Sequence, residues 1–355
     1  MNAFLSGTQV ILSLELRQRV RGTAWYVLLG IFVVLVAIVT ILLSIALTGF
    51  GVMGSGDAGG NIYSAIIYFV LLLGTLVAPA LSGNAINGDR DAGTLATTQV
   101  TLVTTGQIVV GKFLAAWITA LAFLAASVPF LIYAWLVGGL SVTSIVVSIV
   151  VLAIELGIVA AIGVGLSGII TRPLISIVAT YLAVATLSVG TLIAFSLGGF
   201  AVQSTVVSTS SYGMTYSDSG EPLGCSPATT STYETPRFDY LWGILVANPY
   251  VVLADAVPTS YDQAGNPQDL FGYIKYGVRT AQVTPDLTVE YDECTEGVGG
   301  YMDQGPTAQE TIDSTVPGWF VGLAIQTLLG AGALVGAWAR TRTPAGKLPT
   351  GSRIA

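Results

Sequence analysis

Histidine is absent from this chain of 355 residues, and charged residues make up only 9% of it. Without histidine, the Ser-His and Cys-His pairs of nucleophilic catalysis are excluded, as is the commonest metal ligand. The chain also lacks the GxxxxGK[ST] sequence of a phosphate-binding loop. We therefore expect a protein that is not an enzyme and that holds neither a metal ion nor a cofactor of its own.

The shortage of charge also excludes an ordinary soluble domain, in which about a quarter of the residues are charged. Hydrophobic residues make up 53% of the chain, which is typical of a polytopic membrane protein. About 20 helical residues cross a hydrocarbon core. Six segments are long enough: Ala24 to Leu47, Ile62 to Leu81, Ile108 to Val137, Ile145 to Ile170, Leu174 to Phe200, and Trp319 to Trp338. The sequence predicts an all-α fold of six transmembrane helices.

The basic residues predict the orientation of these helices. Residues 48–61 and 138–144 contain no Lys or Arg. All the basic residues outside 202–317 fall on one side, in the other connections, at the start of the third span or at the termini: Arg17, Arg19, Arg21, Arg90, Lys112, Arg172, Arg340, Arg342, Lys347 and Arg353. This is the positive-inside pattern, so we expect both termini in the cytosol and a plasma membrane of the bacterial type. Residues 1–23 are predicted to form an amphipathic helix in the membrane interface, and residues 340–355 a cytosolic tail.

The acidic residues gather elsewhere, so the formal net charge of -7 says nothing about nucleic acid, and we expect none as a partner. Residues 202–317, between spans 1–5 (residues 24–201) and span 6 (residues 318–339), are predicted to form an extracytoplasmic domain. Leu287, Val289 and Tyr291 alternate there as in a strand. Both cysteines, Cys225 and Cys294, lie in this domain and are predicted to form a disulfide; the alternative is two unpaired thiols.

The longest polar interruption on the predicted cytosolic side runs from Asn84 to Lys112, with a loop at residues 83–107. Asp89-Arg90-Asp91 ends one apolar segment, Gly93-Thr94 breaks the chain, and Leu95 to Val103 can form a short helix. Gly111-Lys112 opens the next apolar segment. A short helix held between two spans can act as a lever.

These residues resemble the loop between the second and third spans of permease subunits of type-2 ATP-binding cassette (ABC) exporters. The resemblance lies in Asp89-Arg90-Asp91-Ala92-Gly93-Thr94-Leu95 and in Gly111-Lys112. The family often has Thr-Pro before the third span, where Thr104-Thr105 stands here, and a glutamate at the position of Ala96. A second likeness is the apolar island at residues 241–257, where Asn248-Pro249 is followed by Tyr250 to Leu253, as in the family's two outer half-helices.

The resemblance implies a membrane subunit of an exporter, with ATP and Mg²⁺ bound by a separate ABC ATPase. Asp89, Arg90, Asp91, Gly93, Thr94 and Leu95 would couple the permease to that ATPase. A second permease copy, or a related permease, would complete a dimer in contact with membrane lipids. The substrate would be amphipathic: a lipid, a peptide or a drug-like molecule.

Polar residues inside the predicted spans are the remaining candidates. Glu155 lies deep in the fourth span, where a charge costs at least about 3 kcal/mol, and Gln326 lies in the sixth. Glu155 would be either a substrate-pathway or proton-sensitive group, or a neutral hydrogen-bonded residue that holds helices together. Small residues at Gly157, Ala161 and Gly165, and at Gly332 and Gly336, predict close helix packing, within one subunit or between two.

Two other classes of function stay open. One is an ion-coupled secondary transporter that uses Glu155 as its proton site, although neither an internal repeat nor a pair of broken helices is evident. The other is a non-transporting membrane scaffold whose outer domain recruits partners.

Overall fold

The computed structural model of this chain describes residues 3–49, 58–93, 103–211, 213, 215–219, 222–224, 227–292 and 305–342. Within them, six helical segments are long and apolar enough to cross a membrane, which confirms the six predicted spans. Their bounds are Thr23–Thr48, Ala58–Asp91, Thr105–Val137, Val142–Ile169, Pro173–Ala201 and Trp319–Thr341. The chain is therefore a multi-pass membrane protein by the length and composition of its helices.

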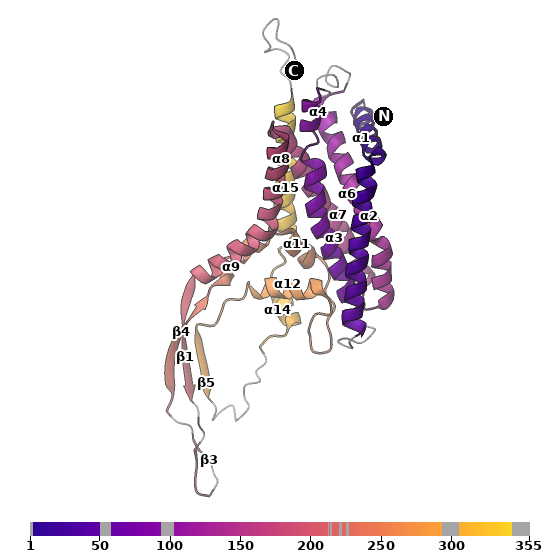
Figure 1. The fold of residues 1–355 in the computed structure, drawn as a ribbon. Helices are drawn as coiled ribbons and strands as arrows, with labels where there is room; N and C mark the ends of the chain where they lie inside the picture. Colours follow the sequence, from indigo (N-terminus) through magenta and orange to yellow (C-terminus); the bar gives the residue numbers. More distant parts are fainter. Residues whose placement is uncertain are drawn as a thin grey trace.

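A bundle of long helices makes up most of the molecule (Figure 1). Its elements are α1 (Ala3–Arg21), α2 (Thr23–Ser44) with the π-helical turn η1 (Ile45–Gly49), α3 (Ala58–Ser82), α4 (Asn87–Asp91), α6 (Thr105–Val137), α7 (Val142–Ile169), α8 (Pro173–Ala185) with the π-helical turn η2 (Thr186–Gly190), α9 (Thr191–Ala201) and α15 (Trp319–Thr341). α1 begins, and α15 ends, at the same end of the bundle (Figure 1).

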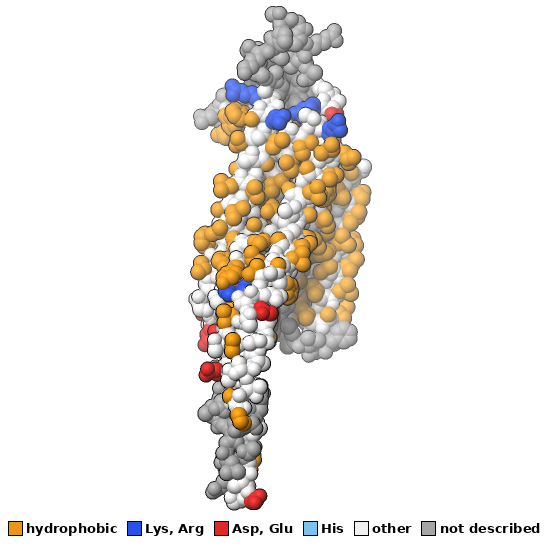
Figure 2. Space-filling model, turned by 90° about the vertical axis from the view of Figure 1, so that its left-hand side faces the viewer, with side chains coloured by type: hydrophobic (Ala, Val, Ile, Leu, Met, Phe, Trp, Pro, Cys, Tyr) orange, Lys and Arg blue, Asp and Glu red, His pale blue; other side chains and the backbone are white. Residues whose placement is uncertain are grey.

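This end is basic, and we call it the basic end. Its exposed cations are Arg17, Arg21, Arg172, Arg340 and Arg342. Figure 2 shows Lys and Arg gathered there, hydrophobic side chains over the bundle, and Asp and Glu toward the opposite end. The charge segregation that the sequence indicates is thus present in space.

α7 is the central helix of the bundle, with α3, α6 and α15 packed around it. Its small residues allow α15 to lie close and parallel: Gly165 packs against Ala333 and Gly168 against Ala337. A Cβ on either glycine would overlap the facing alanine, so both positions require glycine. The predicted small-residue face of α7 therefore packs within one chain. Gly332, in contrast, faces open space.

Residues 202–317, here called the polar domain, contain strands as well as helices. β1 (Gln203–Ser211) lies between β4 (Thr229–Pro236), which is antiparallel to it, and β5 (Thr288–Asp292), which is parallel. β2 (Thr215–Tyr216) and β3 (Pro222–Gly224) form a second, two-stranded sheet. The all-α prediction is therefore wrong for this domain, although β5 lies where the alternation of Leu287, Val289 and Tyr291 indicates a strand.

Short helices fill the space between the sheet and the bundle. They are η3 (Phe238–Tyr240), α10 (Trp242–Leu245), α11 (Pro249–Ala256), α12 (Leu270–Thr280) and α14 (Ala308–Ser314). α12 lies across the end of the bundle that is opposite the basic end, which we call the far end (Figure 1). Phe271 of α12 is fully buried against Tyr63 and Tyr68 of α3.

Several predicted features lie outside the described residues. These are Thr94 and Leu95, most of the short helix predicted over Leu95 to Val103, both cysteines of the predicted disulfide (Cys225 and Cys294), and the tail beyond Arg342.

Candidate functional site

A buried lysine joins three helices at the basic end. The side chain of Lys112, on the second turn of α6, is 3% exposed. Its Nζ pairs with Oε1 of Glu15 on α1 and, at 2.7 Å, with Oδ2 of Asp89 on α4. A buried ammonium without such partners would be strongly destabilising, so this lysine fixes the positions of α1 and α4 relative to α6.

Hydrogen bonds fasten α4 to the end of α7 as well. The backbone N–H groups of Ile86 and Asn87 donate to Ser167 Oγ at 2.9 and 3.1 Å. The buried Asn87 side chain donates to the Ile170 carbonyl at 2.6 Å and accepts from Arg90 Nη1 at 2.9 Å. A displacement of α4 would therefore act on α7 and α6 together, in addition to α3, to which it is covalently continuous.

α1 is held on α6 along much of its length. Thr104 and Gln107 form a capping box at the start of α6, and Gln107 Nε2 also donates to the Phe4 carbonyl at 3.1 Å. Arg19 donates to Thr119 Oγ1 at 3.2 Å and to the Leu81 carbonyl at 3.4 Å. Burial lowers the pKa of Arg19, and the nearby Glu15 carboxylate opposes that shift.

The predicted coupling residues thus divide into three groups. Asp89 pairs with Lys112, and Arg90 supports Asn87. Asp91 ends α4 and is exposed, and Gly93 has a φ of 69°, a left-handed conformation that favours glycine. Thr94 and Leu95 lie outside the described residues.

Sequence reasoning missed three residues of this cluster: Glu15, Asn87 and Ser167. Glu15 had a usable signal, because it is the first acidic residue of the chain and stands within a basic segment. Asn87 and Ser167 carry no comparable signal, since an Asn or Ser near a span end is most often solvated.

The predicted turn between two half-helices lies at Asn248 and Pro249, between α10 and α11. Asn248 is fully buried, and its Oδ1 caps α11 by accepting from the N–H groups of Tyr250 and Val251 at 2.9 and 3.4 Å. Its Nδ2 donates to the Ser188 carbonyl at 2.6 Å and to Thr191 Oγ1 at 2.9 Å. All four hydrogen bonds depend on the amide, so the turn is fixed to the fifth span.

The two intramembrane polar candidates are buried in the same bundle. Gln326, on α15, donates from Nε2 to the carbonyl of Ala247, directly before Asn248, at 3.0 Å. Glu155, on α7, is 1% exposed, and its Oε1 has no hydrogen-bond partner among the described residues. Gln326 therefore has a role in holding the half-helix turn, whereas no contact of Glu155 explains its presence.

A second ion pair holds the polar domain to the far end of the bundle. Asp255 of α11 accepts from Arg279 Nε of α12 at 2.8 Å and from the N–H groups of Gly318 and Trp319, at the start of α15, at 2.7 and 2.9 Å. Lys275 Nζ donates to the Val257 carbonyl at 2.6 Å. Burial lowers the pKa of Lys275, and the Asp255 carboxylate opposes that shift.

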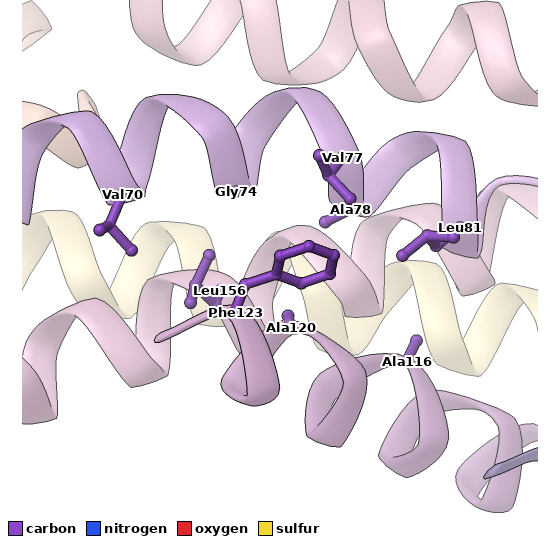
Figure 3. A pocket seen from close by; sticks show the side chains of 9 residues that line it. All are labelled: Val70, Gly74, Val77, Ala78, Leu81, Ala116, Ala120, Phe123 and Leu156. Atoms are coloured by element: carbon purple, nitrogen blue, oxygen red, sulfur yellow. The ribbon is translucent and has the colours of Figure 1, made fainter. Parts of the chain in front are cut away.

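Two apolar spaces lie beside these polar groups. A groove of about 410 Å³ runs between α3, the fifth span and Tyr250, and its walls carry Thr75, Tyr181 and Ser188 among aliphatic side chains. A much smaller cavity lies between α3, α6 and α7, and Phe123 is one of the side chains that line it (Figure 3). No polar side chain lines that small cavity, so it is a packing space and not a site for a polar ligand.

The described residues contain no group of three acidic side chains placed to hold a metal ion. No family model matches the chain, and no curated protein sequence matches it.

Proposed function

We propose that this chain is the permease subunit of an ATP-driven exporter of the type-2 ABC class, acting with a separate ATPase. The observation that carries the proposal is the Lys112 cluster, which joins the connection between the second and third spans to α1, α6 and α7. A partner that pushes on this connection would move four helices at once. The basic character of this end favours a cytosolic location, where an ATPase has access to ATP.

Two further features support this assignment. The fifth span is followed by two half-helices whose turn, at Asn248, is fixed to that span, in line with the resemblance. The groove between α3 and the fifth span is large enough for part of an amphipathic molecule and has an apolar wall with a few hydroxyl groups. A second copy of the chain, or a related permease, placed against this face would enclose the groove as a dimer cavity.

The test is purification of the tagged chain in mild detergent from its native cell, followed by mass spectrometry and an assay of ATP hydrolysis. We expect a P-loop ATPase to copurify, with hydrolysis in the purified complex. Asp91→Arg, on the exposed end of α4, should lower the amount of bound ATPase, and Glu310→Arg, on the polar domain, should not. Recovery of the chain alone after gentle crosslinking, or equal loss in both variants, would refute the proposal.

Glu155 favours a second candidate, an ion-coupled transporter that needs no ATPase. It is the only charged residue in the middle of a described span, and it has no counter-ion there. Transport by the chain alone in vesicles, driven by a proton gradient and lost in Glu155→Gln, would support this candidate over the exporter.

A further inference from the structure

The described spanning helices contain very few charged residues, and none of the others lies near Glu155. Besides Glu155, α2, α3, α6, α7, α8, α9 and α15 contain only Lys112 and Arg340, both near the basic end. Lys112 is already paired with Glu15 and Asp89. The described spanning helices therefore place no cation at the depth of Glu155.

The buried titratable groups on the elements packed around α7 are all engaged by other partners. On α3 the titratable groups are Tyr63, which bonds Ser148, and Tyr68, which donates to the Tyr250 carbonyl. On α8, Tyr181 donates to the Leu76 carbonyl. On α11, the Tyr250 hydroxyl hydrogen-bonds with Thr75. Both oxygens of Asp255 already accept hydrogen bonds, from Arg279 and from the start of α15. On α6 the charged residue is Lys112. A buried carboxylate with no cation and no donor is far more costly than a protonated carboxyl, so these surroundings favour the neutral form of Glu155.

The packing register of α7 and α15 brings Gln326 to the level of Glu155. The two helices are parallel, and Gly330 of α15 packs against the Ile158 carbonyl and Ala161 of α7. One turn earlier on each helix are Gln326 and the segment that contains Glu155. Gln326 Nε2 is fixed by the Ala247 carbonyl, so Oε1 points elsewhere, and that buried oxygen has no donor.

Glu155 Oε1 and Gln326 Oε1 thus lie at the same level of the bundle, and neither has a hydrogen-bond partner among the described residues. One proton shared between them would satisfy both oxygens. We propose that Glu155 is a proton-binding site whose hydroxyl donates to Gln326 Oε1. The bound proton joins α7 to α15 and, through Gln326 and Ala247, to the half-helix turn at Asn248. Loss of the proton leaves a carboxylate facing an amide oxygen, which repels it. The turn must then open to admit water, so the closed turn is favoured by low pH and lost as the pH rises.

Infrared difference spectroscopy of the purified chain in lipid tests the protonation directly. A protonated carboxyl gives a C=O stretching band that carboxylates lack. At neutral pH we expect one such band in the wild type, with a shift in D₂O, and its complete loss in Glu155→Gln. Gln326→Leu removes the acceptor and should move the band to higher frequency. Absence of the band, or a band that survives in Glu155→Gln, would overturn the proton site; a band that Gln326→Leu leaves in place would overturn the assigned partner.

Hydrogen exchange of the turn tests the consequence. With rates corrected for intrinsic exchange, protection of the amides between Val246 and Val252 should fall in the wild type as the pH rises. Glu155→Gln keeps a neutral donor for Gln326 at every pH, so its protection should stay high and independent of pH. Equal pH dependence in both proteins would refute the link between proton and turn. Neither experiment involves an ATPase, so their outcome is separate from that of the proposed function.

Discussion

Two buried carboxyl groups lie on α11 and α7, and their surroundings are opposite. Asp255, at the far end of the bundle, receives hydrogen bonds from a guanidinium and two backbone N–H groups. Glu155, in the middle of α7, has a buried oxygen that receives none. Near a bundle end, short helices and helix N-termini supply donors for a charge. In the middle of a span every backbone N–H is used by its own helix, and the described spans place no cation near Glu155, so the remaining way to neutralise it is a proton.

Breaking the Asp255 pair should have the largest effect. Asp255→Ala leaves Arg279 buried without a counter-ion and frees the N-terminus of α15, so we expect a loss of about 3–5 kcal/mol in stability. Thermal unfolding in detergent measures it. Asp286→Ala removes an exposed carboxylate of the same domain and should change stability by about 0.5 kcal/mol or less.

A double variant sharpens that experiment. Asp255→Leu combined with Arg279→Met removes both charges and restores apolar volume, so it should recover much of the loss. A double variant as unstable as Asp255→Ala would indicate that the N-terminus of α15, and not the uncompensated guanidinium, dominates the effect.

Lys112→Met should have the next largest effect, at the basic end. It leaves the Glu15 carboxylate, which is 14% exposed, without its cation, while Asp89, at 36% exposure, retains access to water. We expect a loss of about 2 kcal/mol and faster hydrogen exchange in α1 and α4. Arg17→Met, on the exposed face of α1, is the control and should leave exchange unchanged; equal effects would show that Lys112 acts only through net charge.

The same comparison shows what a sequence can predict. The six spans follow from runs of apolar residues, because helix length in a membrane is fixed by the thickness of the hydrocarbon core. Glu155 stands out for the same reason, as a charge within such a run. The sequence also points to Gln326 as a polar residue of another span, but which neighbours Glu155 meets depends on the packing register of α7 and α15, and that register is set by which glycine faces which alanine.

The polar domain shows which structural features the sequence does not predict. The alternation near Val289 indicates β5, but the Ser- and Thr-rich β1 and β4 have no apolar alternation that would separate strand from loop. Asp255 and Arg279 are 24 residues apart, and nothing in their spacing indicates that they meet. The cluster of Lys112 with Glu15 is similar, since these residues lie 97 positions apart.

Glu155→Gln should have almost no effect on stability, in contrast to the substitutions of Asp255. If the carboxyl is already neutral, an amide of the same size keeps a donor for Gln326, and we expect a change within about 0.5 kcal/mol at neutral pH. The measurement is thermal unfolding of Glu155→Gln and Asp255→Asn, each compared with the wild type. A loss as large as that of Asp255→Asn would mean that Glu155 is ionised and paired.

A third carboxylate, Asp239, at the base of the sheet, gives a test in which the expected effect depends on pH and is smaller than at Asp255 or Lys112. Its oxygens accept from Arg237 Nε and Nη2 at 2.8 and 2.6 Å, and these hydrogen bonds lower the pKa of Asp239. A carboxyl whose pKa is lower in the folded state stabilises the fold above its ordinary value of about 3.9, and this contribution disappears as the pH falls through the lowered value. The stability difference between wild type and Asp239→Asn should therefore be constant from about pH 5 upward and shrink below about pH 4. A difference that persists undiminished in acid would show that the Asp239 side chain acts through packing, as an uncharged group would, and not through its charge.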